Sequence, residues 1–277
     1  MANLITMAGK GKRFSDAGYL LPKPLIDING EPMIYRVIDS LPESDKWIFV
    51  VREEHIKEHH IDAVIKRKIP DAIIEVDRDL LGGASIFCVE KYFEKNEEVL
   101  IASCDNAFVF DAEKFEELKK EGNACILWTF TNDKRISRYP HSWGYTVLEN
   151  DGKTIKNMSV KVPISNRPEN DHAVTATFYV KSASLLYEAI RLMIEKSIKT
   201  NNEFYLDNLP IAFNLLGRKS VIFDVELYVG FGTPEELHEF ESLLHRHEFS
   251  SIEKAGLDSE CVRVWEKYFC DIHGHKK

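Results

Sequence analysis

The sequence predicts an α/β fold, with a mixed and mainly parallel sheet flanked by helices and a helical extension at the C-terminus. Short apolar runs rich in β-branched and aromatic residues alternate along the chain with stretches whose apolar residues recur at helical spacing. The length of 277 residues, the hydrophobic content of 44% and the charged content of 29% are those of a globular chain and exclude wholesale disorder.

The runs that predict strands are spread over the first two thirds of the chain. Residues 4–7 are apolar and are followed at once by glycines, and residues 47–51 read WIFVV, which is typical of a buried strand. Similar runs occupy residues 99–102, 124–130 and 174–180. Strands that alternate with helices in this way predict a sheet that is covered on both faces.

Two internal helices and one C-terminal helix follow from spacing and capping. Apolar residues form helical stripes over residues 33–41 and 185–193. Thr233 suits an N-cap, Pro234 the first helical position, and Glu236 the third position of a capping box, so a helix is expected to begin there.

The C-terminal end is expected to be a helical appendage rather than a separate domain. A break near residues 249–251 is followed by a helical pattern from about Asp258. We therefore divide the chain into a main domain of residues 1–244 and a helical extension of residues 245–277. The face of that extension with Trp265 and Tyr268 could pack on this chain or on a second copy, so a homo-oligomer stays among the alternatives.

Charge and composition exclude several classes of partner. Acidic residues number 45 and basic residues 36, and the net charge of −9 argues against a protein that binds nucleic acid through a basic face. No apolar run is long enough for a membrane span, and the N-terminus lacks the pattern of a signal peptide. The five dispersed cysteines are expected to be reduced thiols, so we expect a cytoplasmic protein with no membrane or nucleic-acid partner.

The most informative segment is the glycine loop after the first expected strand, MAGKGKRF at residues 7–14, with a Lys23-Pro24 pair downstream. Glycines at positions 9 and 11 allow backbone N–H groups to approach phosphate oxygens closely, and Arg13 can bind phosphate in a bidentate manner. The loop has neither the Walker sequence nor the third glycine of a dinucleotide fingerprint. A bare glycine turn with solvated basic side chains is the alternative.

The strand, the GxGxR loop and the Lys-Pro pair, in this order, resemble the signature of the sugar-phosphate nucleotidylyltransferase (NDP-sugar pyrophosphorylase) family. The resemblance implies a Rossmann-like sheet of the nucleotide-diphospho-sugar transferase type. It also implies that Arg13 and Lys23 are catalytic and stabilise charge on the reacting phosphates. The remaining loop residues would bind the triphosphate, namely Ala8, Gly9, Gly11 and Lys12.

Two further segments match the family in the expected order. The sequence LLGGAS at residues 80–85 resembles the small-residue segment that holds the nucleobase, which implies nucleotide binding by Gly82 and Gly83. A glycine cap before a helix is the alternative. A buried strand then ends in Asp105 and Asn106, which implies that Asp105 binds Mg²⁺ and that Asn106 contacts the nucleotide. An aspartate in an Asx-turn is the alternative here.

A third block, at residues 143–179, resembles the acceptor-binding part of the family. Lys161 matches the lysine that binds the phosphate of the acceptor. Val160 replaces a glutamate that contacts a sugar hydroxyl in the family, and Ala176 replaces a glycine. The lost glutamate leaves room for an acceptor that is not a hexose.

One departure concerns the second metal ligand. The family's second aspartate corresponds to Gly230, two residues before the glycine of the GTPE motif. Asp224 and Glu226 are the candidates to replace it, and Glu226 is the expected substitute. Its even spacing from Gly230 puts Glu226 and Gly230 on the same face of a strand. Solvated acids on an exposed strand, or a metal held by Asp105 and triphosphate oxygens alone, are the alternatives.

The resemblance implies a nucleotidylyltransferase that transfers NMP from CTP, UTP or dTTP to a sugar 1-phosphate or a similar small phosphate, with release of pyrophosphate. Synthesis of capsule or surface-polysaccharide precursors is the expected pathway. A cytidylyltransferase that acts on an amino-acid or alcohol phosphate is one alternative. A non-catalytic nucleotide-sensing module, suggested by Gly230, is a second, and a glycosyltransferase of similar fold is a third.

Overall fold

The computed structural model describes residues 1–78 and 82–245, which form two compact units built from interleaved segments of the chain. Unit 1 comprises Met1–Gly9, Glu43–Ser103 and Ala112–Asp224. Unit 2 comprises Lys10–Pro42, Cys104–Asp111 and the described part of Val225–Lys277. The sequence did not indicate this division. The boundary between a main domain of residues 1–244 and a C-terminal extension stays a prediction, and residues 246–277 lie outside the described part.

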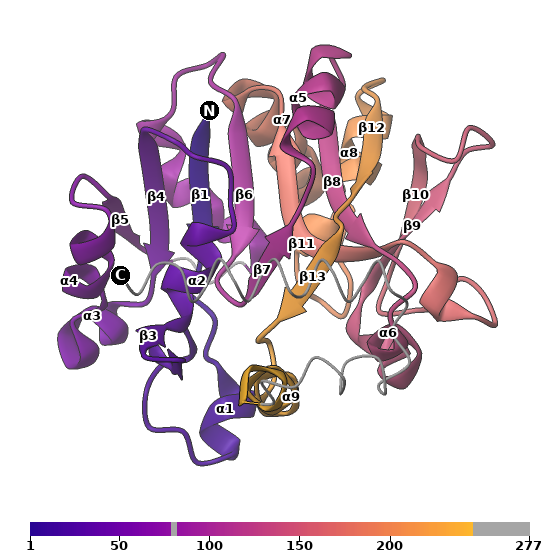
Figure 1. The fold of residues 1–277 in the computed structure, drawn as a ribbon. Coiled ribbons are helices and arrows are strands. Elements are labelled where there is room, and N and C mark those ends of the chain that lie inside the picture. Colours follow the sequence, from indigo (N-terminus) through magenta and orange to yellow (C-terminus); the bar gives the residue numbers. More distant parts are fainter. Residues whose placement is uncertain (79–81, 246–277) are drawn as a thin grey trace. The chain divides into compact units, whose positions relative to one another are not determined.

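Unit 1 is built on one nine-stranded sheet (Figure 1). Its strands are β1 (Ala2–Thr6), β4 (Lys46–Val51), β5 (Ile73–Val76), β6 (Val99–Ser103), β8 (Cys125–Phe130), β9 (Gly144–Leu148), β10 (Ile155–Val160), β11 (Ala173–Val180) and β12 (Ser220–Asp224). The strands expected near residues 4–7, 47–51, 99–102, 124–130 and 174–180 correspond to β1, β4, β6, β8 and β11, so these predictions are confirmed.

The sheet is mixed and mostly parallel, as predicted. Strands β5, β4, β1 and β6 lie side by side and run parallel. Strand β11 pairs antiparallel with both β6 and β8, and β12 then pairs parallel with β8. The hairpin of β9 and β10 joins the sheet through β11. Because a parallel connection needs a crossover, the central strands are far apart in sequence and are linked by helices.

Helices and short 3-10 helices (η) cover the sheet of unit 1. They are α3 (Glu53–His59), α4 (Ile61–Lys68), η2 (Gly83–Tyr92), α5 (Ala112–Lys120), α6 (Lys134–Arg138), η3 (Pro140–Ser142), η4 (Pro168–Asn170), α7 (Ala183–Glu195), η5 (Leu206–Asn208) and α8 (Leu209–Leu215). Within the described residues, none of the helices has the length and hydropathy that a membrane span requires.

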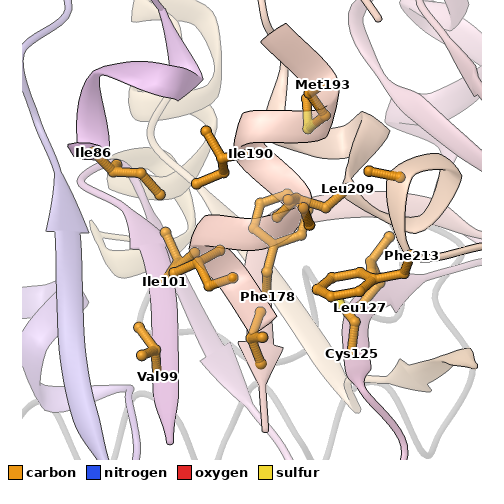
Figure 2. Packing of buried hydrophobic residues seen from close by; sticks show 14 of the residues in the cluster. Ile86, Val99, Ile101, Cys125, Leu127, Phe178, Ile190, Met193, Leu209 and Phe213 are labelled. Carbon is orange, nitrogen blue, oxygen red and sulfur yellow. The ribbon is translucent and has the colours of Figure 1, made fainter. Parts of the chain in front are cut away.

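Both faces of the sheet are packed against helices, which confirms the layered arrangement. Figure 2 shows Ile190 and Met193 of α7 and Phe213 of α8 facing residues of β6, β8 and β11. On the other face, the ring of Phe115 in α5 lies 5.2 Å from that of Trp128 and 5.3 Å from that of Phe223. Alternate residues of each strand thus supply the two cores, as strand geometry requires.

Unit 2 is smaller, and its described residues form two two-stranded ribbons, three α-helices and one 3-10 helix. Its elements are α1 (Lys12–Asp16), η1 (Lys23–Leu25), β2 (Asp27–Ile28), β3 (Glu31–Pro32), α2 (Met33–Asp39), β7 (Asn106–Val109), β13 (Leu227–Gly230) and α9 (Pro234–His245). Strands β7 and β13 pair antiparallel, with Gly230 opposite Asn106 and Leu227 opposite Val109. A separate core of Phe14, Met33, Phe231, Leu237 and Phe240 holds these elements together.

The start of α9 confirms the predicted cap. The Thr233 hydroxyl accepts a hydrogen bond from the backbone N–H of Glu236 at 3.1 Å, so one of the unpaired N–H groups of the first turn is satisfied. Leu237 and Phe240 on the inner side of the helix are buried. The cap and these two anchors fix the direction in which the first turn of α9 presents its side chains.

Candidate functional site

A short ion pair in unit 2 joins two residues that the sequence singled out separately. Lys23 begins η1 and Asp105 directly precedes β7, and the Lys23 Nζ atom lies 2.5 Å from the Asp105 Oδ2 atom. Both side chains are about one-fifth exposed, at 21% and 18%. A charge-assisted hydrogen bond at this depth is strong and still reachable from solvent.

The surroundings keep Lys23 charged. Burial acts to lower its pKa, but the neighbouring Asp105 carboxylate outweighs burial and raises the pKa of Lys23 above its ordinary value. Arg13, which is exposed on α1, opposes this effect with its own positive charge. The electrostatic influence of Arg13 on Lys23 indicates that the two cations are near one another in unit 2.

Gly11 is the N-cap of α1 and adopts a left-handed conformation with φ of 60°. A Cβ atom at this position would lie 3.4 Å from the Lys23 Cβ atom. The glycine therefore allows the loop to turn and to run beside Lys23. Lys12 follows on α1 and is exposed, so the part of the glycine loop from Gly11 to Arg13 and the Lys-Pro segment belong to one cluster.

The first residues of the glycine loop belong to unit 1. The carbonyl oxygen of Ala8 accepts a hydrogen bond from Arg52 Nη1 at 3.3 Å, and a Cβ atom at Gly9 would meet no other atom within 4 Å. Gly9 is thus not required by packing. Arg52 was not singled out by the sequence, since it lies outside every motif and is recognised only through this contact with the loop.

Asn106 lies on the ribbon of unit 2, beside the metal candidate. Its side chain is buried, and its Oδ1 atom accepts a hydrogen bond from the Tyr228 hydroxyl at 2.7 Å. The backbone N–H of Phe231 donates to the Asp105 carbonyl at 2.8 Å. These bonds across the ribbon fix the Asp105–Asn106 backbone, and the Tyr228 ring reaches Asn106 by passing over Gly230.

The structure does not bring Glu226 together with Asp105. Leu227 pairs with Val109 and Gly230 pairs with Asn106, so Glu226 lies at the opposite end of the ribbon, roughly 16 Å of strand away. Even spacing places Glu226 and Gly230 on the same face, but a shared face does not bring distant residues into contact. Asp224 is also engaged elsewhere, because it accepts a hydrogen bond from Thr129 at 2.7 Å in unit 1.

The carboxylate that reaches the neighbourhood of Asp105 belongs to Glu236. A Cβ atom on Gly232 would lie 3.2 Å from Asp105 Oδ2 and 3.1 Å from Glu236 Oε2. Those two oxygens are therefore at most 6.3 Å apart, the sum of the two distances. Within the described residues, no three His, Cys, Asp or Glu side chains form a metal site. Mg²⁺ in nucleotide sites usually takes one or two carboxylates and completes its shell with phosphates and water, which fits this pair.

In unit 1, Gly82 and Gly83 are packed against the segment before η5. The Gly83 N–H donates to the Phe204 carbonyl at 2.7 Å, and a Cβ atom on Gly83 would lie only 2.6 Å from that oxygen. Gly82 has a φ of 64°. The pair is thus required by close backbone contact, whether or not it also contacts a nucleobase.

Lys161 follows β10 in unit 1 and has an unusual backbone, with φ of 67°. Its ammonium group donates to the Ser142 carbonyl and lies 5.8 Å from the centre of the Tyr205 ring. The left-handed backbone turns the side chain away from the strand direction of β10. Lys161 is partly exposed to solvent.

A second group that the sequence did not indicate is Asp207, in η5. Burial raises the pKa of its carboxyl to about 6, and the positive charge of Lys161 partly opposes that increase. A Cβ atom on Gly144 would lie 2.4 Å from Asp207 Oδ2, so only glycine fits there. Perturbed carboxyl groups of this kind are common at functional sites.

Asp207 lines a cavity of about 170 Å³ in unit 1. The other lining residues are Thr6, Gly83, Ala176, Phe178, Glu203, Phe204, Tyr205 and Leu206. Gly83 and Ala176 were noted in the sequence as parts of two different motifs, and the cavity brings them together. Glu203 and Asp207 add two carboxylates to a cavity with aromatic walls.

Most of the described chain matches a known protein family. Residues 3–181 match the model of the MobA-like NTP transferase domain. The comparison with curated proteins finds no match. The solved structures that resemble the chain are below 25% identity, so they bear on the fold alone.

Three of these structures are a nucleoside-diphosphate-sugar pyrophosphorylase from Vibrio cholerae RC9, the inositol-1-phosphate CTP transferase from T. maritima and a UDP-glucose pyrophosphorylase complexed with UDP-glucose. The first has a TM-score of 0.69 at 19% identity and covers 86% of this chain and 98% of its own. The second has a TM-score of 0.64 at 15% identity, with coverages of 96% and 95%. The third has a TM-score of 0.65 at 16% identity, with coverages of 90% and 100%.

The sheet order places β1 next to β6 and β4, and the family model covers the chain from the first strand to the end of β11. That stretch includes the glycine loop, Lys23, Asp105 and Lys161 and amounts to nearly two thirds of the chain. The chain therefore belongs to the MobA-like NTP transferase domain family and is a nucleotidyltransferase.

Proposed function

We propose that this enzyme transfers a nucleoside monophosphate from CTP, UTP or dTTP to the phosphate group of a small acceptor. An oxygen of the acceptor phosphate attacks the α-phosphorus of the nucleotide and forms a new P–O bond. The bond between the α-phosphorus and the bridging oxygen breaks, and pyrophosphate leaves with the electron pair. Such a reaction requires positioning and charge neutralisation more than covalent help from the protein.

The observation that carries the proposal is the Lys23–Asp105 pair beside Gly11 in unit 2. A lysine that stays charged next to a glycine turn suits the triphosphate, whose charge increases on the leaving pyrophosphate. Arg13 supports the same charge from α1. Backbone groups of Ala8, Gly9, Gly11 and Lys12 are the proposed partners of the phosphate oxygens.

Asp105 is the proposed protein ligand of Mg²⁺. When bound, Mg²⁺ supplies positive charge to the phosphate oxygens of the nucleotide. Asp105 then has two tasks, because its carboxylate also orients Lys23. Asn106, whose backbone is held by the ribbon, is proposed to contact a part of the nucleotide other than its phosphates. Gly82 and Gly83 are proposed to contact the nucleobase.

Lys161 is the proposed partner of the acceptor phosphate. Support comes from its partly exposed ammonium group, which lies 5.8 Å from the centre of the Tyr205 ring in the cavity wall. Glu203 and Asp207 of the same cavity can accept hydrogen bonds from hydroxyl groups. The structural neighbours include a nucleoside-diphosphate-sugar pyrophosphorylase and an inositol-1-phosphate CTP transferase, which favours a sugar or polyol phosphate as acceptor.

A cytidylyltransferase that acts on an amino-acid or alcohol phosphate is the second candidate. Val160 favours this second candidate, because a valine at this position lacks the carboxylate that would bind a sugar hydroxyl. The carboxylates and aromatic rings of the cavity also suit an ammonium group. For either acceptor we propose a cytoplasmic reaction, which the free thiols Cys88, Cys104 and Cys125 support, and a role in surface-polysaccharide precursor synthesis.

The test is pyrophosphate release with CTP, UTP, dTTP, ATP and GTP against a panel of phosphorylated acceptors. The panel contains sugar 1-phosphates, inositol 1-phosphate, and phosphates of amino acids and amino alcohols. We expect release with a pyrimidine nucleotide and one acceptor class, and mass spectrometry should find the matching diphosphate-linked product. Nucleotide binding with no release from any pair would contradict the proposal.

A further inference from the structure

Gly230 and Gly232 have no side chains, and the carboxylate of Glu236 lies close to the ribbon of unit 2 at both positions. A Cβ atom on Gly230 would lie 2.9 Å from Glu236 Oε1, closer than side-chain carbons approach oxygen. The same atom would lie 3.0 Å from the Tyr228 ring. The space in which a side chain at position 230 would begin is therefore already taken by Glu236 and Tyr228.

The other oxygen of Glu236 faces Asp105. Glu236 Oε2 and Asp105 Oδ2 border the same space above Gly232, at 3.1 Å and 3.2 Å from the position of a Cβ atom. A Mg²⁺ ion holds its oxygens at about 2.0–2.1 Å and keeps several waters, so a pair of carboxylates at most 6.3 Å apart can share one ion directly or through a bound water.

We propose that Glu236 is the second carboxylate of the metal site and takes the place of an acid on strand β13. This inference rests on the proposed function, since it concerns the metal that accompanies the nucleotide. The second ligand has moved from the strand to the first turn of α9, where the Thr233 cap fixes the backbone of Glu236. Positions 230 and 232 are glycines in this arrangement, because a side chain at either position would displace the carboxylate of Glu236.

A purely structural explanation competes with the proposal. Glu236 is the third residue of α9, and a glutamate there can complete a capping box by accepting from the N–H of residue 233. A glutamine does this equally well, whereas a neutral amide is a much poorer ligand for Mg²⁺. The variant Glu236→Gln therefore separates the two roles, because it keeps the cap and removes the charge.

The experiment measures Mn²⁺ affinity by electron paramagnetic resonance, with Mn²⁺ alone and with Mn²⁺ plus CTP, UTP or dTTP. We expect Glu236→Gln and Asp105→Asn each to weaken Mn²⁺ binding at least tenfold. The matched control Glu235→Gln changes the same charge one residue earlier on α9 and should stay within twofold of the parent. Gly232→Ala, which removes no ligand atom, should weaken Mn²⁺ binding severalfold because its methyl group would push the two carboxylates apart.

The outcomes distinguish this inference from the proposed reaction. Unchanged Mn²⁺ affinity in both Glu236→Gln and Gly232→Ala, with a loss in Asp105→Asn, overturns the role of Glu236 and leaves the reaction intact. Weakened Mn²⁺ binding in a protein that releases no pyrophosphate supports Glu236 and contradicts the reaction. A parent protein that binds Mn²⁺ under none of these conditions overturns both. Circular dichroism melting checks that each variant is folded.

Discussion

Lys23 Nζ and Asp105 Oδ2 are joined at 2.5 Å, although 82 residues separate the two positions in the chain. The pair neutralises two groups that are proposed to act on the same nucleotide, one through its positive charge and one through a metal. In the unliganded protein each residue therefore holds the other in place. Both groups are oriented before the nucleotide arrives, which lowers the cost of organising the site during the reaction.

The first prediction concerns Lys23. Lys23→Ala should reduce kcat by about a hundredfold to a thousandfold or more, because a positioned charge at the reacting phosphates is lost. The unfolding midpoint should fall only slightly, since Asp105 remains partly exposed to water. Pyrophosphate release at saturating substrates measures the first effect and thermal melting the second.

The control for Lys23 is Lys57→Ala, which removes an exposed lysine that pairs with Glu53 on α3. Its kcat should equal that of the parent, as expected for a surface ion pair of small energy. Equal turnover in Lys23→Ala and Lys57→Ala would remove Lys23 from the catalytic machinery.

The second prediction concerns Lys161. Lys161→Ala should raise the KM for the acceptor by about tenfold to a hundredfold, because one charge-assisted contact with the acceptor phosphate is lost. The KM for the nucleotide should remain within about twofold of the parent value. Steady-state kinetics with each substrate varied in turn separates the two, and an equal rise of both constants would argue for a general distortion.

The third prediction uses the raised pKa of Asp207, about 6 against an ordinary 3.8. The folded protein favours the protonated carboxyl. The contribution of Asp207 to the free energy of unfolding is therefore fully present below about pH 3.8, and it is lost as the pH rises through about 6. At pH 8, Asp207→Asn should increase the free energy of unfolding by at most about 3 kcal/mol.

Denaturant unfolding of parent and variant at several pH values tests this prediction. The difference between the two proteins should vanish near pH 4 and reach its maximum above pH 7. Glu203→Gln is the matched control, because Glu203 lines the same cavity but is exposed. A difference for Asp207→Asn that is constant between pH 4 and pH 8 would contradict the assigned ionisation.

The fourth prediction concerns Gly83 and Gly9, both of which were predicted from the sequence to bind the nucleotide. Gly83→Ala should lower the free energy of unfolding by about 1–3 kcal/mol, since its methyl group would lie 2.6 Å from the Phe204 carbonyl oxygen. Gly9→Ala meets no atom within 4 Å and should leave the stability unchanged. If Gly9 approaches phosphate as proposed, the same Gly9→Ala variant should weaken nucleotide binding in a calorimetric titration.

The fifth prediction concerns the bulge of β11. Ala176 has a φ of 58°, a conformation that glycine adopts without strain, and it lies where the register of β11 against β8 shifts. Ala176→Gly should therefore raise the free energy of unfolding by up to about 1 kcal/mol, the relief of strain exceeding the entropy that glycine adds to the unfolded chain. Ala189→Gly, in the middle of α7, should instead destabilise by about 1 kcal/mol.

The fold was largely predictable because its signals are local. Strands such as β4 are continuous apolar runs, and α9 is marked by a capping threonine, a proline and an apolar stripe. The candidate site was predictable only where family motifs marked it, as for Lys23 and Asp105. Their direct contact could not be derived, because it depends on how η1 and β7 meet in unit 2.

The second carboxylate near Asp105 and the perturbed Asp207 could not be predicted from the sequence. Glu226 was chosen by strand parity, which fixes the face of a residue but not its distance along the ribbon. Glu236 was assigned to capping, since nothing local shows that Gly230 and Gly232 leave room for its carboxylate. The pKa of Asp207 is raised by burial, and one of the residues packed against its carboxylate is Gly144, more than sixty residues earlier in the chain.

The interleaving of the two units sets the order in which this chain can fold. The chain crosses between the units five times, and β7 has its partner strand β13 about 120 residues downstream. During synthesis, most of unit 1 is available while Asp105 and its neighbours still lack the strand that holds them. The ribbon of β7 and β13 can form only after β13 has left the ribosome, so Asp105 and Asn106 gain their partner strand late in synthesis. A chain that ends before residue 227 cannot form this ribbon, although much of the sheet of unit 1 can form.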